Sequence, residues 1–110
     1  MATMVRKFSN ELTDAEHERL AILAEELGEA QQAIGKILRH GYESYNPVVD
    51  TGQTNRRDLE RELGDIVFAV KMLTDNQDVN RAGIELRAKQ KAQSIVRWLH
   101  HQAKPGGSDV

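Results

Sequence analysis

The chain has 110 residues, of which 39% are hydrophobic, and its 15 basic and 17 acidic residues give a net charge of -2. This length suits one domain of about three helices with a small core, and the charge excludes the strongly basic footprint of a protein that binds duplex nucleic acid. Because cysteine is absent, disulfides and thiolate sites are excluded and the reducing cytoplasm is the expected compartment. No stretch approaches the roughly 18 apolar residues of a membrane span, so no membrane association is expected.

The first predicted helix begins near Thr13 and runs to about Arg39. Its start, Thr13-Asp14-Ala15-Glu16, is typical of a capping box, and Gly41 is expected to end it. Its apolar residues recur at steps of three and four, the period of an amphipathic helix with one inward stripe. They are Leu20, Leu23, Leu27, Ala30, Ile34 and Leu38.

A long connection follows, from His40 to Thr54, with several glycine, asparagine and proline residues and little periodicity. Long connections of this kind are commonly functional, so we interpret it as a lid or a segment that contacts a base. Tyr42, Tyr45 and Asn46 could stack on a base and hydrogen-bond to it. The polarity of a surface loop would also explain these residues.

The second predicted helix runs from Asn55 to about Asp75. It carries a main apolar stripe and further apolar residues elsewhere on its circumference, which predicts burial on more than one side. The stripe consists of Leu59, Leu63, Ile66, Val70 and Leu73, and the further residues are Phe68, Ala69 and Met72.

A third helix is predicted from Asn80 to His101, after a break in the periodicity. Its inward residues are expected to be Ile84, Ala88, Ala92, Ile95 and Leu99. Residues 1–12 and 103–110 are expected to be irregular tails.

A short acidic phrase occurs twice, as Glu26-Leu27-Gly28-Glu29 and as Glu62-Leu63-Gly64-Asp65. On a helical wheel the two acids of each phrase flank the apolar stripe on the same side, so two packed helices would present equivalent acidic edges. Ions taken out of water cost several kcal/mol each unless compensated. A divalent cation would compensate them, and Mg²⁺ suits a site made only of carboxylates, with Mn²⁺ able to substitute. The alternative is that these acids are solvated residues on two ordinary amphipathic helices.

The glycine inside each phrase is a second indication. Glycine within a helix costs about 0.5–1 kcal/mol relative to alanine. Its presence at the same place in both phrases predicts that backbone or a ligand approaches closely there.

The segment Glu25-Glu26-Leu27-Gly28-Glu29, followed by Glu62-Leu63-Gly64-Asp65-Ile66-Val67, resembles the EExxE and ExxD motif pair of the MazG-like all-α nucleoside triphosphate pyrophosphohydrolases. The resemblance extends over residues 14 to about 100. It implies a single all-α domain over residues 1–110, with antiparallel helices whose four-helix-bundle-type catalytic core is completed by oligomerisation, as a homodimer or a dimer of dimers. The metal ligands that it implies are Glu26, Glu29, Glu62 and Asp65, while Glu25 matches the extra acid of the first motif.

The activity that the resemblance implies is Mg²⁺-dependent hydrolysis of a nucleoside or deoxynucleoside triphosphate to the monophosphate and pyrophosphate, which would sanitise or balance a nucleotide pool. Either Glu25 or Glu29 could accept the proton of the attacking water. Arg87 and Lys91 on the third helix are the preferred phosphate contacts, and Lys36 is a weaker candidate. These long side chains could instead cover the core with their stems and keep their charges in water.

Two other readings of the sequence stay open. A narrower relative would act on dUTP, dCTP or phosphoribosyl-ATP. A hypothesis from a different class is a non-catalytic helical dimerisation or regulatory module that keeps the acidic cluster as a structural cation site.

Overall fold

The computed structural model describes residues 9–45, 48 and 52–103. Its elements are α1 (Asp14–His40), α2 (Asn55–Asp75), α3 (Arg81–Ser94) and a short 3₁₀-helix, η1 (Ile95–Trp98). The described residues contain no strand, so the predicted all-α class is confirmed. No helix among them combines the length and apolarity that crossing a membrane requires. The chain divides into two compact units, of which the first ends at Asp78 and the second begins at Val79.

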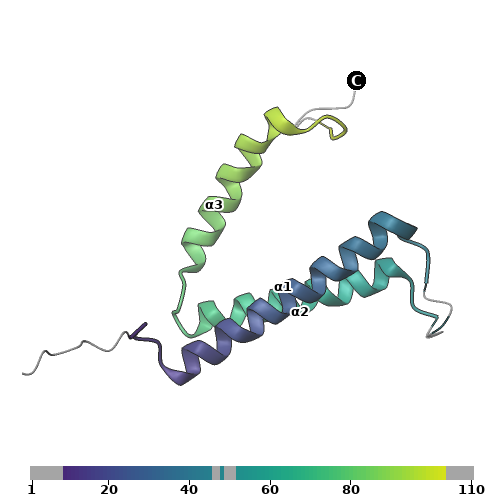
Figure 1. The fold of residues 1–110 in the computed structure, drawn as a ribbon. Coiled ribbons are helices and arrows are strands. Elements are labelled where there is room, and N and C mark those ends of the chain that lie inside the picture. Colours follow the sequence, from purple (N-terminus) through teal and green to yellow (C-terminus); the bar gives the residue numbers. More distant parts are fainter. Residues whose placement is uncertain (1–8, 46–47, 49–51, 104–110) are drawn as a thin grey trace, which may run out of the picture. The chain divides into compact units, whose positions relative to one another are not determined.

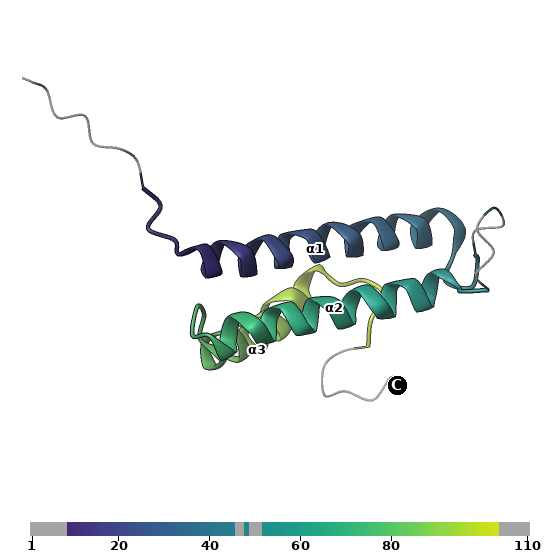
Figure 2. The same ribbon diagram turned by 90° about the horizontal axis from the view of Figure 1, so that it is seen from below.

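The first unit is a hairpin in which α1 and α2 run antiparallel along most of their length (Figures 1 and 2). The start of α1 is the predicted capping box. The backbone N–H of Thr13 donates to Glu16 Oε1 at 2.9 Å, and the backbone N–H of Glu16 donates to Thr13 Oγ1 at 3.1 Å. Gly41 ends the helix with φ of 87°, a value that favours glycine, and donates to the Ile37 carbonyl.

The start of α2 is capped by Thr54, whose hydroxyl oxygen accepts from the backbone N–H of Arg57 at 3.3 Å. The helix has the predicted bounds. After it, the turn to Asp78 is tied back to α1, because Arg19 donates from Nε and Nη2 to the two carboxylate oxygens of Asp78 at 2.6 and 2.9 Å. Both side chains are largely buried. The Arg19 hydrogen bonds hold the pKa of Asp78 below its ordinary value.

The core between α1 and α2 is small. Its buried apolar residues are Ala30, Ala33, Ala69 and Leu73. Alanine at the contact allows two helices to lie close together, because the distance between helix axes depends on the side chains between them. The close contact therefore runs along Ala30 and Ala33 of α1 and along Ala69 and Leu73 of α2.

The stripe of α1 that the periodicity predicted to face inward is only partly buried. Ala30 is buried and Leu23 is half-buried, but the four other large apolar residues of the stripe are exposed. Together with two residues of α2 these four form what we call the apolar face: Leu20, Leu27, Ile34, Leu38, Leu63 and Val67, all between 44% and 82% exposed. The expectation was wrong for these four residues of α1 because α2 packs on the side of α1 that carries Ala30 and Ala33. Of the further apolar residues of α2, Ala69 is buried and Phe68 is 59% exposed.

The second unit departs most from expectation. The predicted helix to His101 ends at Ser94 and continues only as η1. The β-branched pair Ile95-Val96 lowers helix propensity at this point. Of the expected inward residues, Ile95 is half-buried and the others are exposed, because the described part of this unit holds no second α-helix against which they could pack. A single domain over the whole chain, with irregular tails, stays a prediction; the described residues 9–12 and 103 belong to no helix or strand.

Candidate functional site

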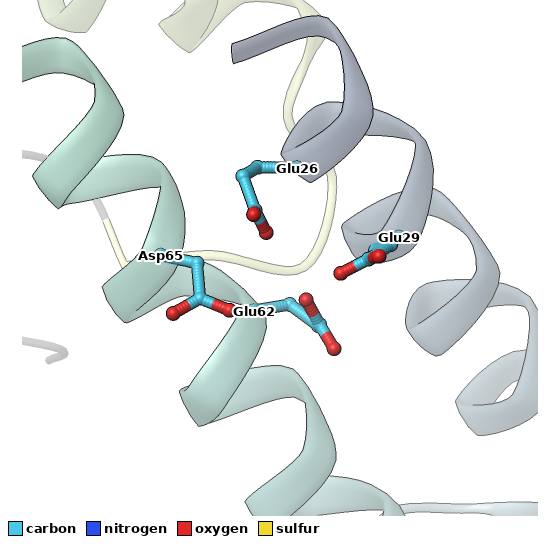
Figure 3. A group of neighbouring side chains, drawn as sticks. All are labelled: Glu26, Glu29, Glu62 and Asp65. Atoms are coloured by element: carbon cyan, nitrogen blue, oxygen red, sulfur yellow. The ribbon is translucent and has the colours of Figure 1, made fainter. Parts of the chain in front are cut away.

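Four carboxylates meet between the two helices of the hairpin, two from each (Figure 3). One oxygen atom from each side chain lies within 4.8 Å of the corresponding oxygens of the other three. The residues are Glu26 and Glu29 of α1 and Glu62 and Asp65 of α2. The structure thus brings together all four acids of the repeated phrase.

The alanine contacts explain how these acids come so close. Ala30 directly follows Glu29, and Ala69 lies one turn after Asp65; both alanines are buried between the helices. Side chains three and four positions apart share one side of a helix. The acids that border the alanines therefore point into the seam between the helices.

The cluster of carboxylates between α1 and α2 is electrostatically unfavourable when no cation is bound. Glu26 Oε2 and Glu62 Oε2 are buried and lack a hydrogen-bond partner among the described residues. Burial, followed by repulsion from Asp65 and Glu29, raises the pKa of Glu26. Burial and the adjacent Glu29 carboxyl raise the pKa of Glu62. A buried polar atom left without a partner is unfavourable.

These residues fit a divalent cation. The cluster supplies only carboxylate oxygens, the ligand type that Mg²⁺ and Mn²⁺ prefer. The two unpartnered oxygens belong to opposite helices, and both side chains are members of the cluster. A cation there would give both atoms a partner and cancel the repulsion that raises the pKa values of Glu26 and Glu62.

A cavity of about 270 Å³, which we call the inner pocket, adjoins the cluster. Two of its lining residues, Glu29 and Glu62, belong to the cluster itself. The others are Gln32, Ala33, Lys36, Asn55, Asp58 and Arg61.

A second cavity of about 490 Å³, the outer pocket, lies toward the connection between α1 and α2. It shares Lys36, Asn55 and Asp58 with the inner pocket, so the two cavities adjoin along the hairpin. Its remaining lining residues are Arg39, His40, Ser44 and Tyr45.

The boundary between the pockets is held by Asn55, which is buried. Its backbone N–H donates to the Ser44 carbonyl at 2.8 Å, and its side-chain Nδ2 donates to the Gly41 carbonyl at 3.1 Å. The first residue of α2 thus fixes the start of the connection. Arg56 adds to this order, because its guanidinium lies 4.4 Å above the Tyr42 ring and its Nε donates to Glu43 at 2.7 Å.

The other predicted site residues on α1 and in the connection fall in different places. Lys36 lines both pockets. Glu25 is exposed on α1 and lies outside the four-residue cluster. The Tyr42 ring is covered by Arg56 and lines neither pocket, whereas Tyr45 lines the outer one. The prediction for Asn46 falls outside the described residues.

Arg87 and Lys91 are exposed on α3 and belong to the second unit. Their role as phosphate contacts stays a prediction. The expected close approach at Gly28 and Gly64 is not found within the described chain, because a Cβ atom added at either position would have no neighbour within 4 Å outside its own helix backbone.

Asp58 and Arg61 line the inner pocket but were not predicted as site residues. Arg61 lies four residues before Asp65 and three after Asp58, so helical spacing places all three on one side of α2. That spacing was the available signal. Asn55 was predicted only as the start of the helix, and its place between the two pockets depends on contacts with the connection that no local pattern reveals.

Comparison with known proteins gives one family. The sequence model of the MazG nucleotide pyrophosphohydrolase domain matches residues 14–99, which include α1, α2, α3 and all four acids of the cluster. No curated protein and no solved structure matches the chain significantly.

Proposed function

Since the chain belongs to the MazG nucleotide pyrophosphohydrolase family, we propose that it hydrolyses nucleoside or deoxynucleoside triphosphates to the monophosphate and pyrophosphate, with Mg²⁺ as cofactor. The observation that carries this proposal is the carboxylate cluster, in which Glu26 and Glu62 each bury an oxygen that has no hydrogen-bond partner in the described part of the chain. Such a reaction would remove or balance nucleotides, and we expect it in the cytoplasm. A narrower substrate, such as dUTP, dCTP or phosphoribosyl-ATP, is an outcome that the experiment below distinguishes.

Phosphoryl transfer demands positioning and charge neutralisation more than covalent chemistry from the protein. The residues that would hold Mg²⁺ are Glu26, Glu29, Glu62 and Asp65. When bound, the ion would neutralise phosphate oxygens and make a water molecule easier to deprotonate.

Among the two candidate bases, the geometry favours Glu29. Its carboxylate belongs to the cluster and also lines the inner pocket, where a phosphate beside the cation would lie. A general base must reach the proton that it accepts. Glu25 is exposed and lines neither pocket, so we assign it no direct part in the proton transfer.

We also propose that the protein is a homodimer or a dimer of dimers. The support is the apolar face, because monomeric proteins seldom leave a contiguous run of large apolar side chains exposed along a helix hairpin. A second copy covering this face would complete a four-helix bundle. Arg87 and Lys91 of α3 are kept as further candidate phosphate contacts in that assembly.

The test of the activity is pyrophosphate release from a panel of canonical, deoxy and modified nucleoside triphosphates, with Mg²⁺ and with EDTA. The wild type is compared with Glu62→Gln, which removes one carboxylate of the cluster, and with Glu60→Gln, which removes an exposed carboxylate of the same helix outside it. We expect Mg²⁺-dependent release that falls at least a hundredfold in Glu62→Gln and is unchanged in Glu60→Gln, a loss of about 2.7 kcal/mol in transition-state stabilisation.

No release from any nucleotide by a folded wild type would overturn the triphosphatase proposal. If Mg²⁺ nevertheless stabilised the wild type and left Glu62→Gln unaffected, the non-catalytic module with a structural cation site would be supported instead. A steep preference within the panel would identify the substrate.

A further inference from the structure

The inner pocket opens directly beside the carboxylate cluster. Glu29 and Glu62 belong to both, so a ligand in this pocket would contact the cation that the cluster fits. Arg61 immediately precedes Glu62 on α2, and its charge lowers the pKa of the Glu62 carboxyl against the effects that raise it. The two sites are therefore electrostatically coupled.

The charges of the inner pocket and the adjoining cluster are predominantly negative. Two cations, Lys36 and Arg61, stand against the lining carboxylates of Glu29, Asp58 and Glu62 and the cluster carboxylates of Glu26 and Asp65, so the formal sum is 2 - 5 = -3 with every carboxylate ionised. A divalent cation in the cluster raises this sum to -1. Charges at the short separations within one pocket interact strongly. An anion is therefore repelled much more strongly from the metal-free site than from the loaded one, where its oxygens could also contact the cation.

The two cations are available to a ligand. Lys36 comes from α1 and Arg61 from α2, on the two sides of the pocket. In the described part of the chain neither forms an ion pair within 4.0 Å, in contrast to Arg19, Arg56 and Lys71, which each hold a carboxylate.

The side chains also suit phosphate oxygens in their chemistry. A guanidinium offers a planar pair of donors to two phosphate oxygens, and an ammonium acts as a mobile point charge. Gln32 and Asn55 line the same pocket with neutral amides. The pocket thus combines two cations and two amides beside a cation site.

We propose that Lys36 and Arg61 bind the phosphate chain of the substrate in the inner pocket, and that this binding requires the cation in the adjacent cluster. Asp58 contributes to this requirement, because its carboxylate adds to the negative charge that repels an anion before the cation is bound. The inference rests on the proposed function and assigns two phosphate-binding residues, of which Arg61 lies outside the acidic motifs. It predicts that the phosphate chain enters as the metal complex and is excluded from the metal-free protein.

The experiment is calorimetric titration of the full chain with inorganic pyrophosphate, at saturating Mg²⁺ and in EDTA. The variants are Lys36→Gln and Arg61→Gln, with Arg57→Gln as the matched control, since Arg57 is exposed on the same helix and lines neither pocket. We expect binding to the wild type only with Mg²⁺, weakened about tenfold by either pocket substitution and unchanged in Arg57→Gln, the tenfold loss corresponding to 1.4 kcal/mol.

A gain of binding gives the sharper test. Asp58→Asn removes one of these negative charges and changes the formal sum of the Mg²⁺-loaded site from -1 to 0, so this variant should bind pyrophosphate more tightly than the wild type at saturating Mg²⁺. A substitution that merely disturbed the structure would not tighten binding. Circular dichroism establishes that each variant keeps its helices.

The outcomes separate this inference from the proposed function. Binding that depends on Mg²⁺ and Arg61, in a protein that hydrolyses no nucleotide, would support the pocket and overturn the enzyme. Hydrolysis in which Lys36→Gln and Arg61→Gln keep wild-type pyrophosphate affinity would support the enzyme and overturn the pocket. Equal binding by the wild type with and without Mg²⁺, or no binding with Mg²⁺, would also overturn the inference.

Discussion

Two glutamate oxygens, one on each helix of the hairpin, are buried without a hydrogen-bond partner among the described residues. Glu26 and Glu62 have raised pKa values because burial and neighbouring carboxylates disfavour their charged forms. A carboxyl group whose folded pKa is raised destabilises the folded state once the pH exceeds its unfolded value. At neutral pH these residues therefore oppose folding of the metal-free protein, as is common where binding groups are held ready for a ligand.

The substitution Glu26→Gln tests whether this carboxylate destabilises the metal-free protein. The substitution keeps the shape of the side chain and removes a charge that is repelled by Asp65 and Glu29. We expect a higher melting temperature than the wild type in EDTA, and loss of the stabilisation by Mg²⁺, which for the wild type would be about 2.7 kcal/mol at a concentration one hundred times Kd. Thermal unfolding in EDTA and in Mg²⁺ measures both. Glu60→Gln should behave as the wild type, and a lower melting temperature of Glu26→Gln in EDTA would contradict the argument.

At the scale of elements, the hairpin is held at its two ends by different contacts. Near the connection, Asn55 ties α2 to the residues that follow α1. At the other end, Arg19 of α1 holds Asp78 in the turn after α2 through two hydrogen bonds. Between them lies only a small apolar core. These ties therefore help to set the register that brings the acids of the two helices opposite each other.

The Arg19–Asp78 pair gives the hairpin a defined pH dependence. Because the folded pKa of Asp78 is lowered, its stabilisation is complete above the unfolded value of about 3.9 and is lost as the pH falls through the folded value. We expect Asp78→Asn to melt below the wild type at pH 7, with the difference shrinking below about pH 4. Thermal unfolding from pH 7 to pH 2 measures the difference. Asp75→Asn, an exposed control, should show a smaller effect at pH 7; a difference for Asp78→Asn that does not change with pH would contradict the assignment.

The elements also show what could be predicted from sequence. The bounds of α1 and α2 follow from local signals, as in the capping box of Thr13 and Glu16. The acidic cluster could be predicted because a phrase repeated on two helices places its acids on equivalent edges. The side of α1 that packs on α2 could not, since periodicity marks a stripe of leucines together with Ala30 but does not reveal that the side with Ala30 and Ala33 permits the closer contact. The pockets needed tertiary structure, because their residues come from both helices and the connection.

At the scale of the whole molecule, the hairpin carries functional groups and apolar groups on different sides. Leu20, Leu27 and Ile34 are seven residues apart and therefore lie along one line on α1. Glu29 and Lys36 lie more than a quarter of a turn around the helix from that line. The apolar face is thus separated from the inner pocket. A second copy could cover the apolar face and leave the pocket open to substrate.

Val67→Glu tests that arrangement. Val67 is 69% exposed on the apolar face, so a glutamate there is tolerated by the hairpin but would place an unpaired charge in an interface, which is strongly unfavourable. We expect the wild type to sediment as a dimer or tetramer and Val67→Glu to shift toward the monomer. The helices of the variant should also be less stable than those of the wild type, because the bundle loses half of its helices. Analytical ultracentrifugation over a range of concentrations measures the assembly.

The matched control for this test is Arg57→Glu, which introduces a glutamate at an exposed position of the same helix outside the apolar face. It should keep the assembly of the wild type. A wild type that is monomeric at every concentration would contradict the proposed oligomer, and an unchanged oligomer in Val67→Glu would show that the copies meet elsewhere. Because the apolar face lies away from the inner pocket, Val67→Glu should still bind Mg²⁺ whenever its hairpin remains folded. Loss of the oligomer with retention of the cation site would therefore show that the hairpin alone builds the carboxylate cluster.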